Sequence, residues 1–266
     1  MKNIIAVASG KGGVGKSTVS ANLAVWLAQY GAEINAGQSL QVALVDVDFC
    51  GPSIPVIMGG GSILSDKDNK IIPASKYGVK YISIAFFLQN NDDPIIWRGP
   101  RFGKAMEQLF NDISWGEIDI CIVDLPPGTG DAQLSLAQVV QLAGAVMVTT
   151  PQEVAVSDVR RAVNMFAKVN VPILGVVENM AGLTLPNGEI LHLFGQGGGQ
   201  ALCDQYQLKM LGSIPLDMKV REGGDKGMPI VLDKDSAVCQ AYDGIAKGLW
   251  AQLATSQENV APIIEN

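Results

Sequence analysis

Eight residues close to the amino end, Gly10 to Ser17, restrict the possible folds of this chain more than any other stretch. They read GKGGVGKS and satisfy the pattern GxxxxGK[ST]. An apolar run with the character of a buried strand, Ile4–Ala8, precedes them, and a stretch with helical spacing of apolar residues, Lys16–Tyr30, follows. A strand, a glycine-rich turn and a helix in that order predict a loop whose backbone amides bind phosphate oxygens.

The same loop carries the side chains that ATP with magnesium requires. We expect Lys16 to neutralise the β- and γ-phosphates and the Ser17 hydroxyl to be a magnesium ligand. Glycines allow the backbone to curl around the phosphates. The residues expected at the nucleotide are Gly10, Lys11, Gly12, Gly13, Val14, Gly15, Lys16, Ser17 and Thr18. The sequence therefore predicts a magnesium-dependent ATPase.

The rest of the chain alternates short apolar runs with longer stretches of helical periodicity. The runs are almost continuously apolar, which is typical of parallel strands buried on both faces. Strands are expected at Ile4–Ala8, Val42–Val45, Ile118–Val123, Gly144–Thr149, Ile173–Val177 and Leu208–Ile214, and helices at Lys16–Tyr30, Pro100–Phe110, Ala132–Ala143, Ser157–Val169 and Ala237–Leu253. The alternation predicts an α/β fold with a doubly wound, mostly parallel sheet and helices on both faces. Without repeats or a Pro- or Ser-rich linker, residues 1–266 are expected to form a single domain.

Carboxylates follow two of the predicted strands. Asp46 and Asp48 close one strand, and Asp124 closes another. Ligands of open α/β sheets bind beyond the carboxyl ends of the strands, so Asp48 and Asp124 are candidate magnesium ligands, with Asp124 holding a metal-bound water. Asp48 is also the candidate for orienting, and deprotonating, the water that attacks the γ-phosphate, beside Lys16 as a catalytic lysine. The alternative for each aspartate is the capping of a turn.

Composition and charge exclude several classes of partner. The chain has 266 residues and a net charge of −7, which argues against a broad basic surface for nucleic acid. No apolar run approaches the roughly 18 residues that a membrane-spanning helix needs. The four cysteines, Cys50, Cys121, Cys203 and Cys239, form no CxxC pair. We therefore expect a cytoplasmic protein with reduced thiols and with neither nucleic-acid nor membrane partners.

Lys11 separates this loop from an ordinary phosphate loop. The segment KGGVGKST resembles the deviant phosphate loop of the MinD/ParA/ArsA class of dimerising ATPases. The resemblance implies a homodimer in which Lys11 reaches the phosphates of the partner subunit. It also implies that Asn179 and the segment around Pro215 lie near the adenine, and an Asn amide can both donate to and accept from a purine edge.

Further motifs narrow the resemblance to the Mrp (ApbC) branch, whose members are iron–sulfur cluster carrier or scaffold ATPases. The motifs are DVDFCGPSIP from Asp46, WRGP from Trp97, DLPPGTGD from Asp124 and VVENM from Val176, and the resemblance spans about residues 3 to 255. It implies slow ATP hydrolysis in iron–sulfur cluster assembly or transfer, with client or scaffold proteins as partners.

One motif of that branch is missing. Its members bridge a cluster between two subunits with a Cys-Pro-x-Cys motif, and the corresponding stretch here is Leu185-Pro186-Asn187-Gly188. Leu185 and Gly188 stand where the bridging cysteines would be, and neither can replace a thiolate. Cys203 and the single histidine, His192, are the remaining candidate ligands, although a buried thiol and a plain loop histidine are the simpler interpretations.

The missing thiols leave a second functional class open. A nucleotide-switched positioning or partner-docking ATPase, like MinD or ParA, would need the same phosphate loop and would bind no iron–sulfur cluster.

Two runs of glycine, Gly59–Gly61 and Gly197–Gly199, are expected to be loops. The second glycine cluster could instead open a helix and offer its amides to an anion.

Overall fold

The computed structural model describes residues 1–49, 51–66, 70–87 and 100–258. Cys50 and three residues of the WRGP motif, Trp97, Arg98 and Gly99, therefore lie outside the described residues. Within the described part of the chain, the main sheet has nine strands, in the order β10-β9-β8-β1-β7-β2-β6-β5, with β11 also paired to β9. The pairs β10–β9 and β5–β6 are antiparallel, and the other pairs of this sheet are parallel.

The strands follow the buried apolar runs of the sequence. They are β1 (Asn3–Ser9), β2 (Val42–Asp46), β5 (Ala74–Lys76), β6 (Val79–Ser83), β7 (Ile120–Asp124), β8 (Gly144–Thr149), β9 (Ile173–Thr184), β10 (Ile190–Leu191) and β11 (Met210–Leu216), and a separate hairpin pairs β3 (Leu64–Ser65) with β4 (Ile71–Ile72). Successive side chains of a strand point to opposite faces, which places Ile5 and Val7 in one core and Ala6 and Ala8 in another.

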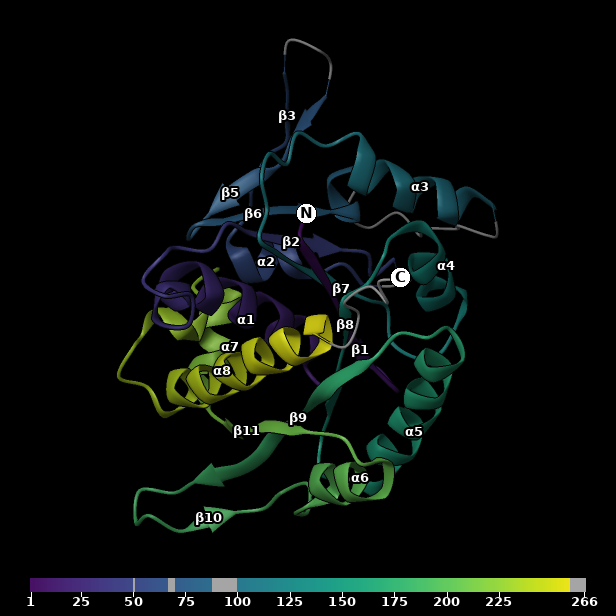
Figure 1. Ribbon diagram of the computed structural model, residues 1–266. Helices are drawn as coiled ribbons and strands as arrows, with labels where there is room; N and C mark the ends of the chain where they lie inside the picture. The colour runs from purple at the N-terminus through teal and green to yellow at the C-terminus, as the bar shows by residue number, and fades with distance from the viewer. Residues whose placement is uncertain (50, 67–69, 88–99, 259–266) are drawn as a thin grey trace.

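Helices cover both faces of the sheet, as Figure 1 shows for α1 and α8 on one side and α3 to α5 on the other. The first core is closed by α1 (Lys16–Tyr30), α2 (Ile54–Met58) and α8 (Ala237–Glu258), and the second by α3 (Pro100–Asn111), α4 (Asp131–Val139), α5 (Glu153–Lys168) and α6 (Gly198–Tyr206). The remaining elements are α7 (Met218–Asp225) and the short 3₁₀ helices η1 (Gly31–Glu33), η2 (Ile84–Phe87) and η3 (Ile230–Leu232). The predicted doubly wound α/β fold is confirmed.

Several predicted boundaries were wrong. The helix expected to end at Ala143 ends at Val139, because Val140 takes an extended conformation and the Ala143 amide donates to Ile4 in β1. The helix expected from Ser157 begins four residues earlier, at Glu153. The strand expected to end at Val177 continues to Thr184, because β11 pairs with β9 as far as Leu183. The contacts between Ala143 and β1 and between β9 and β11 join segments far apart in sequence, so local periodicity does not predict them.

Candidate nucleotide site

The phosphate-loop motif lies between the end of β1 and the start of α1. Gly15 caps α1 in the left-handed conformation, with φ of 80°, which glycine adopts without the strain of a side chain. Gly10 is needed for a different reason. A methyl group there would lie 2.2 Å from the carbonyl carbon of Asp158 in α5. The loop therefore starts in direct backbone contact with a helix from the other face of the sheet.

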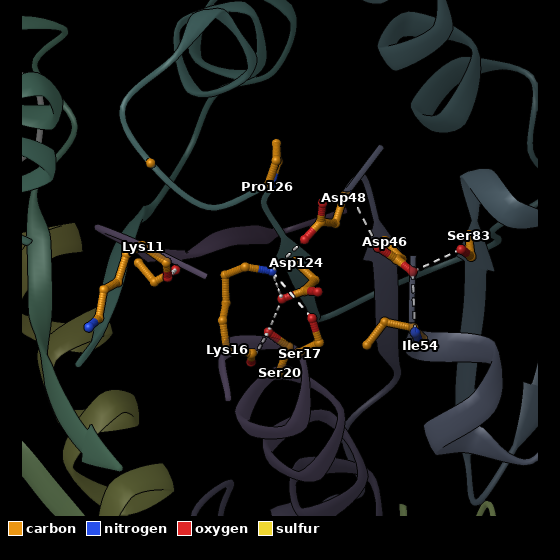
Figure 2. A network of polar contacts seen from close by, with 12 residues as sticks. Lys11, Lys16, Ser17, Ser20, Asp46, Asp48, Ile54, Ser83, Asp124 and Pro126 are labelled. Atoms are coloured by element: carbon orange, nitrogen blue, oxygen red, sulfur yellow. Dashed lines mark hydrogen bonds and ion pairs between the residues drawn. The ribbon is translucent and has the colours of Figure 1, made fainter. Parts of the chain in front are cut away.

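Lys16 is the centre of the polar network of Figure 2. Its ammonium group lies 2.9 Å from Asp124 Oδ1 and 3.5 Å from Asp48 Oδ2, and it donates to the Ser17 hydroxyl at 3.3 Å. All three charged side chains are buried. The structure thus brings together Lys16, Ser17, Asp48 and Asp124, four of the residues that the sequence predicted for catalysis or metal binding.

Asp124 is held on one side and unpaired on the other. Its Oδ1 also accepts a hydrogen bond of 2.7 Å from the Ser20 hydroxyl, whereas its buried Oδ2 has no hydrogen-bond partner among the residues that the structure describes. A buried acceptor without a partner costs about 1–3 kcal/mol, so a donor at this point would be stabilising. A water molecule bound to magnesium would be such a donor, and the carboxylates around Lys16 carry negative charge that a divalent cation would offset. The residues present therefore fit a magnesium ion.

Asp46 is a further buried carboxylate, and the sequence did not select it as a site residue. It faces Asp124 in the register of β2 and β7. Its Oδ1 accepts from the Asp48 amide at 3.1 Å, and its Oδ2 accepts from the Ile54 amide at 3.3 Å and the Ser83 hydroxyl at 2.8 Å. Burial, followed by the charge of Asp124, raises the pKa of Asp46 to about 7. Asp46 anchors both ends of the segment that carries Asp48.

Lys11 does not join this network. Its side chain is directed away from Lys16 and the aspartates in Figure 2, while its backbone carbonyl accepts from the Ser9 hydroxyl at 3.0 Å. It lines a cavity of about 260 Å³ together with the phosphate loop, Asp48 and Pro127. The two lysines of the motif thus occupy different surroundings within one protomer.

A second cavity, of about 470 Å³, adjoins the phosphate loop at Gly15 and Thr18 and contains the two residues predicted near the adenine. Asn179, at 8% exposure, donates its amide to the Val14 carbonyl at 2.8 Å. Pro215, in β11, also lines this cavity. Other residues of its wall include Val56, Ile57, Leu216, Asp217, Arg221 and Tyr242. The cavities together extend from the phosphate loop to a partly apolar pocket, which suits a nucleotide.

The second glycine cluster does open a helix, but the Gly199 amide in it donates to a side chain of this protein. Gly197 caps α6 with φ of 77°, and the Gly199 amide donates to Glu178 Oε2 at 2.6 Å. Sequence reasoning missed Glu178, together with Ser20, Ser83 and Gln133, which are all buried polar residues near the site. Glu178 directly precedes Asn179 in β9, and this neighbouring position is the sequence feature that could have identified Glu178 as a site residue.

The segment Leu185–Gly188, which the sequence analysis set against the Cys-Pro-x-Cys motif, forms the turn of the β9–β10 hairpin. The Leu185 amide donates to the Glu189 carbonyl at 2.8 Å, and the Gly188 amide donates to the Leu185 carbonyl at 2.9 Å. Cys203 is buried in the second core, and burial raises the pKa of its thiol to about 11. Among the described residues, no three His, Cys, Asp or Glu side chains are arranged to hold a metal ion.

Comparison with known proteins shows the family of this chain. The family model described as ParA, NUBPL iron-transfer P-loop NTPase, matches residues 1–250. The chain belongs to this family. The iron-sulfur cluster carrier protein of Aquifex aeolicus is 50% identical over 263 residues, which cover 97% of this chain and 70% of that protein. The iron-sulfur cluster transfer protein NUBPL of Dictyostelium discoideum is 46% identical over 258 residues, covering 95% and 77%. The resemblance to the Mrp branch is confirmed.

Solved structures of relatives place the family among nucleotide-binding folds. A nucleotide-binding protein from Archaeoglobus fulgidus in complex with ADP is 37% identical, with a TM-score of 0.71 over 85% of this chain and 86% of that one. The septum site-determining protein MinD from Pyrococcus horikoshii, complexed with Mg-ADP, shares the fold at 22% identity, with a TM-score of 0.66 over 92% of this chain and 95% of that one.

Among the helices of the described residues, none has the length and apolarity required to cross a bilayer.

Proposed function

We propose that this chain is a single-domain, cytoplasmic ATPase that binds Mg-ATP, hydrolyses it slowly as a homodimer, and acts in iron–sulfur cluster assembly or transfer. The observation that carries the proposal is the buried contact of Lys16 with Asp124 and Asp48 inside a phosphate-loop motif. Membership of the NUBPL family and the names of the relatives from Aquifex aeolicus and Dictyostelium discoideum support the cluster role.

The chain's own residues account for each part of ATP hydrolysis. Lys16 exchanges its two carboxylate partners for oxygens of the β- and γ-phosphates, and the loop amides bind the same oxygens. Ser17, Asp48 and Asp124 are the residues that would hold the magnesium ion, directly or through water, and the metal would offset phosphate charge. Asp48 orients the attacking water and accepts its proton as the bond to the leaving ADP oxygen breaks. Lys11 adds charge from the partner subunit.

Substitutions of the two lysines and Asp48 separate binding from turnover. Calorimetry with Mg-ATP is expected to show saturable binding for the natural chain and for Asp48→Asn, and none for Lys16→Ala. Asp48→Asn is expected to lose about a hundredfold or more in phosphate release, since its amide cannot accept the proton. Lys11→Ala is the comparison variant, because it should still bind Mg-ATP while losing the proposed homodimer in light scattering. Saturable binding by Lys16→Ala, or full turnover by Asp48→Asn, would refute the assigned roles.

The cluster role needs a separate experiment. The dimer is reconstituted anaerobically with iron and sulfide, and visible absorbance and iron content are measured. Uptake of iron and sulfide that can be passed on to an apo-ferredoxin would support the carrier role. Since Leu185 and Gly188 supply no thiolate, the ligands would come from elsewhere in the dimer or from a client protein. A dimer that takes up no iron, yet co-sediments with liposomes or DNA only when ATP is present, would instead support the positioning class.

A further inference from the structure

Gln133 is a buried amide beside the candidate site that no step of the proposed hydrolysis uses. It lies in the first turn of α4 and is 1% exposed. Its Nε2 donates to the Pro126 carbonyl at 3.0 Å and to the Gly128 carbonyl at 2.8 Å. Both carbonyls belong to the 125–130 segment, which leaves the sheet directly after Asp124 and passes through Pro126 (Figure 2).

The same segment is tied to the strand that leads into the phosphate loop. The Leu125 amide donates to the Val7 carbonyl at 3.1 Å, and the Gly128 amide donates to the Ser9 carbonyl at 3.0 Å. Between these two hydrogen bonds, Pro127 lines the phosphate cavity together with the loop, and a methyl group on Gly12 would lie 3.9 Å from Pro127 Cγ. The segment is thus held from β1 on one side and from Gln133 on the other.

The orientation of the amide follows from its partners. Both hydrogens of Nε2 are used by carbonyl groups, and the reversed amide would place its oxygen against two carbonyl oxygens. The Oε1 atom is then left buried, with no hydrogen-bond partner in the described part of the chain. An unpaired buried acceptor is destabilising, so the amide is a poor choice if packing of α4 were its whole purpose. Its distinguishing capacity is to hold two carbonyl groups of one segment at once.

We propose that Gln133 is a positioning residue, which keeps the 125–130 segment, and with it Asp124 and Pro127, in the arrangement that ATP hydrolysis requires. The inference rests on the proposed ATPase activity. Without the two donated hydrogens, the Pro126 and Gly128 carbonyls turn toward water, and the wall of the phosphate cavity shifts with them. Nucleotide affinity is retained, because the loop amides and Lys16 hold the phosphates without help from Gln133.

Three variants test the proposal in the full chain. Gln133→Met keeps the length of the side chain and removes the donor, and Gln138→Met makes the same change at an exposed position of the same helix. Gln133→Met is expected to lower kcat about tenfold or more, with KM for Mg-ATP and Kd for ADP within about twofold of the natural values. Gln138→Met should change none of these. A natural kcat in Gln133→Met, an equal loss in Gln138→Met, or a parallel loss of ADP binding would overturn the proposal.

Gln133→Glu gives a readout that a packing role would not change. Its carboxylate faces two carbonyls and cannot donate, whereas its protonated form donates one hydrogen bond. The kcat of Gln133→Glu, relative to that of the natural chain, is therefore expected to rise as the pH is lowered. A ratio that is independent of pH would contradict the donor role.

Hydrogen exchange keeps this test separate from the proposed function. Peptides covering residues 125–130 of the nucleotide-free protein should exchange faster in Gln133→Met than in Gln138→Met, since the tie of the Gly128 amide to Ser9 is weakened. This measurement needs no catalysis. If the natural chain released no phosphate, the proposed function would fail. Unchanged hydrogen exchange in Gln133→Met would independently refute the proposal that Gln133 keeps the 125–130 segment in place.

Discussion

Replacing Asp46 by asparagine is expected to change how the free energy of unfolding depends on pH. Asp46 ends β2, which lies between β6 and β7, and it is fully buried; burial and the charge of Asp124 raise its pKa from 3.8 to about 7. Because the folded state keeps its proton over a range where the unfolded state has lost it, folding is favoured at low pH. This contribution to stability is present below about pH 4 and is lost as the pH rises through about 7.

The size of the effect follows from the shift. One pKa unit corresponds to about 1.4 kcal/mol, so the full titration of Asp46 changes the free energy of unfolding by about 4 kcal/mol. About 3 kcal/mol of this falls between about pH 5 and about pH 8. The amide that Asp46→Asn introduces does not titrate, so the stability of this variant relative to the natural chain should rise by about 3 kcal/mol across that range.

Urea denaturation of the nucleotide-free protein, followed by circular dichroism at a series of pH values, measures this difference. Asp119→Asn is the control, because the hydrogen bond and charge of Lys2 lower the pKa of Asp119 and place its titration below that range. Its stability relative to the natural chain should be constant between about pH 5 and about pH 8. Parallel curves for Asp46→Asn and the natural chain would refute the reasoning.

Three further outcomes are expected from the packing of the fold. Gly10→Ala should lower the free energy of unfolding by about 3 kcal/mol or more, because its methyl group would overlap the backbone of Asp158. Gly12→Ala, which has room, is its control, and equal melting temperatures would contradict the account. Glu178→Gln should lower the free energy of unfolding by about 1–2 kcal/mol in urea titrations, because the Gly199 amide loses a charged acceptor at the start of α6. The exposed Glu189→Gln should show no such loss. Burial raises the pKa of Cys121 to about 12 and that of Cys203 to about 11, so iodoacetamide at about pH 8 should label neither in the native protein. Peptide mass spectrometry that found either thiol labelled before unfolding would contradict this.

The elements that the sequence predicted best are those with a strong local signal. The helix predicted at Lys16–Tyr30 and the strand predicted at Gly144–Thr149 have the bounds that the structure gives them. The first begins at a phosphate-loop motif, and the second is a continuous apolar run that is buried on both faces. Elements shaped by distant partners were missed or misjudged, among them α2, α7 and the second half of β9.

The candidate site shows the same division. Lys16, Ser17 and the aspartates at the strand ends follow from their positions relative to the strands. The roles of Ser20, Ser83 and Gln133 do not, because each depends on a contact across the fold, such as the bond from Ser83 to Asp46 and the bond from Ser20 to Asp124. A Ser or Gln within a helix or strand has the same local signature whether it faces solvent or a buried carboxylate.

The sequence by itself determined the phosphate loop, the alternation of strands and helices, and the family, since these depend on residues adjacent in the chain. The tertiary structure decided the rest. Because β7 inserts between β1 and β2, Asp124 lies against Asp46 and within reach of Lys16, although 78 residues separate the two aspartates in sequence. Burial of Asp46, followed by the charge of the neighbouring Asp124, raises the pKa of Asp46, and both causes depend on how distant segments are brought together.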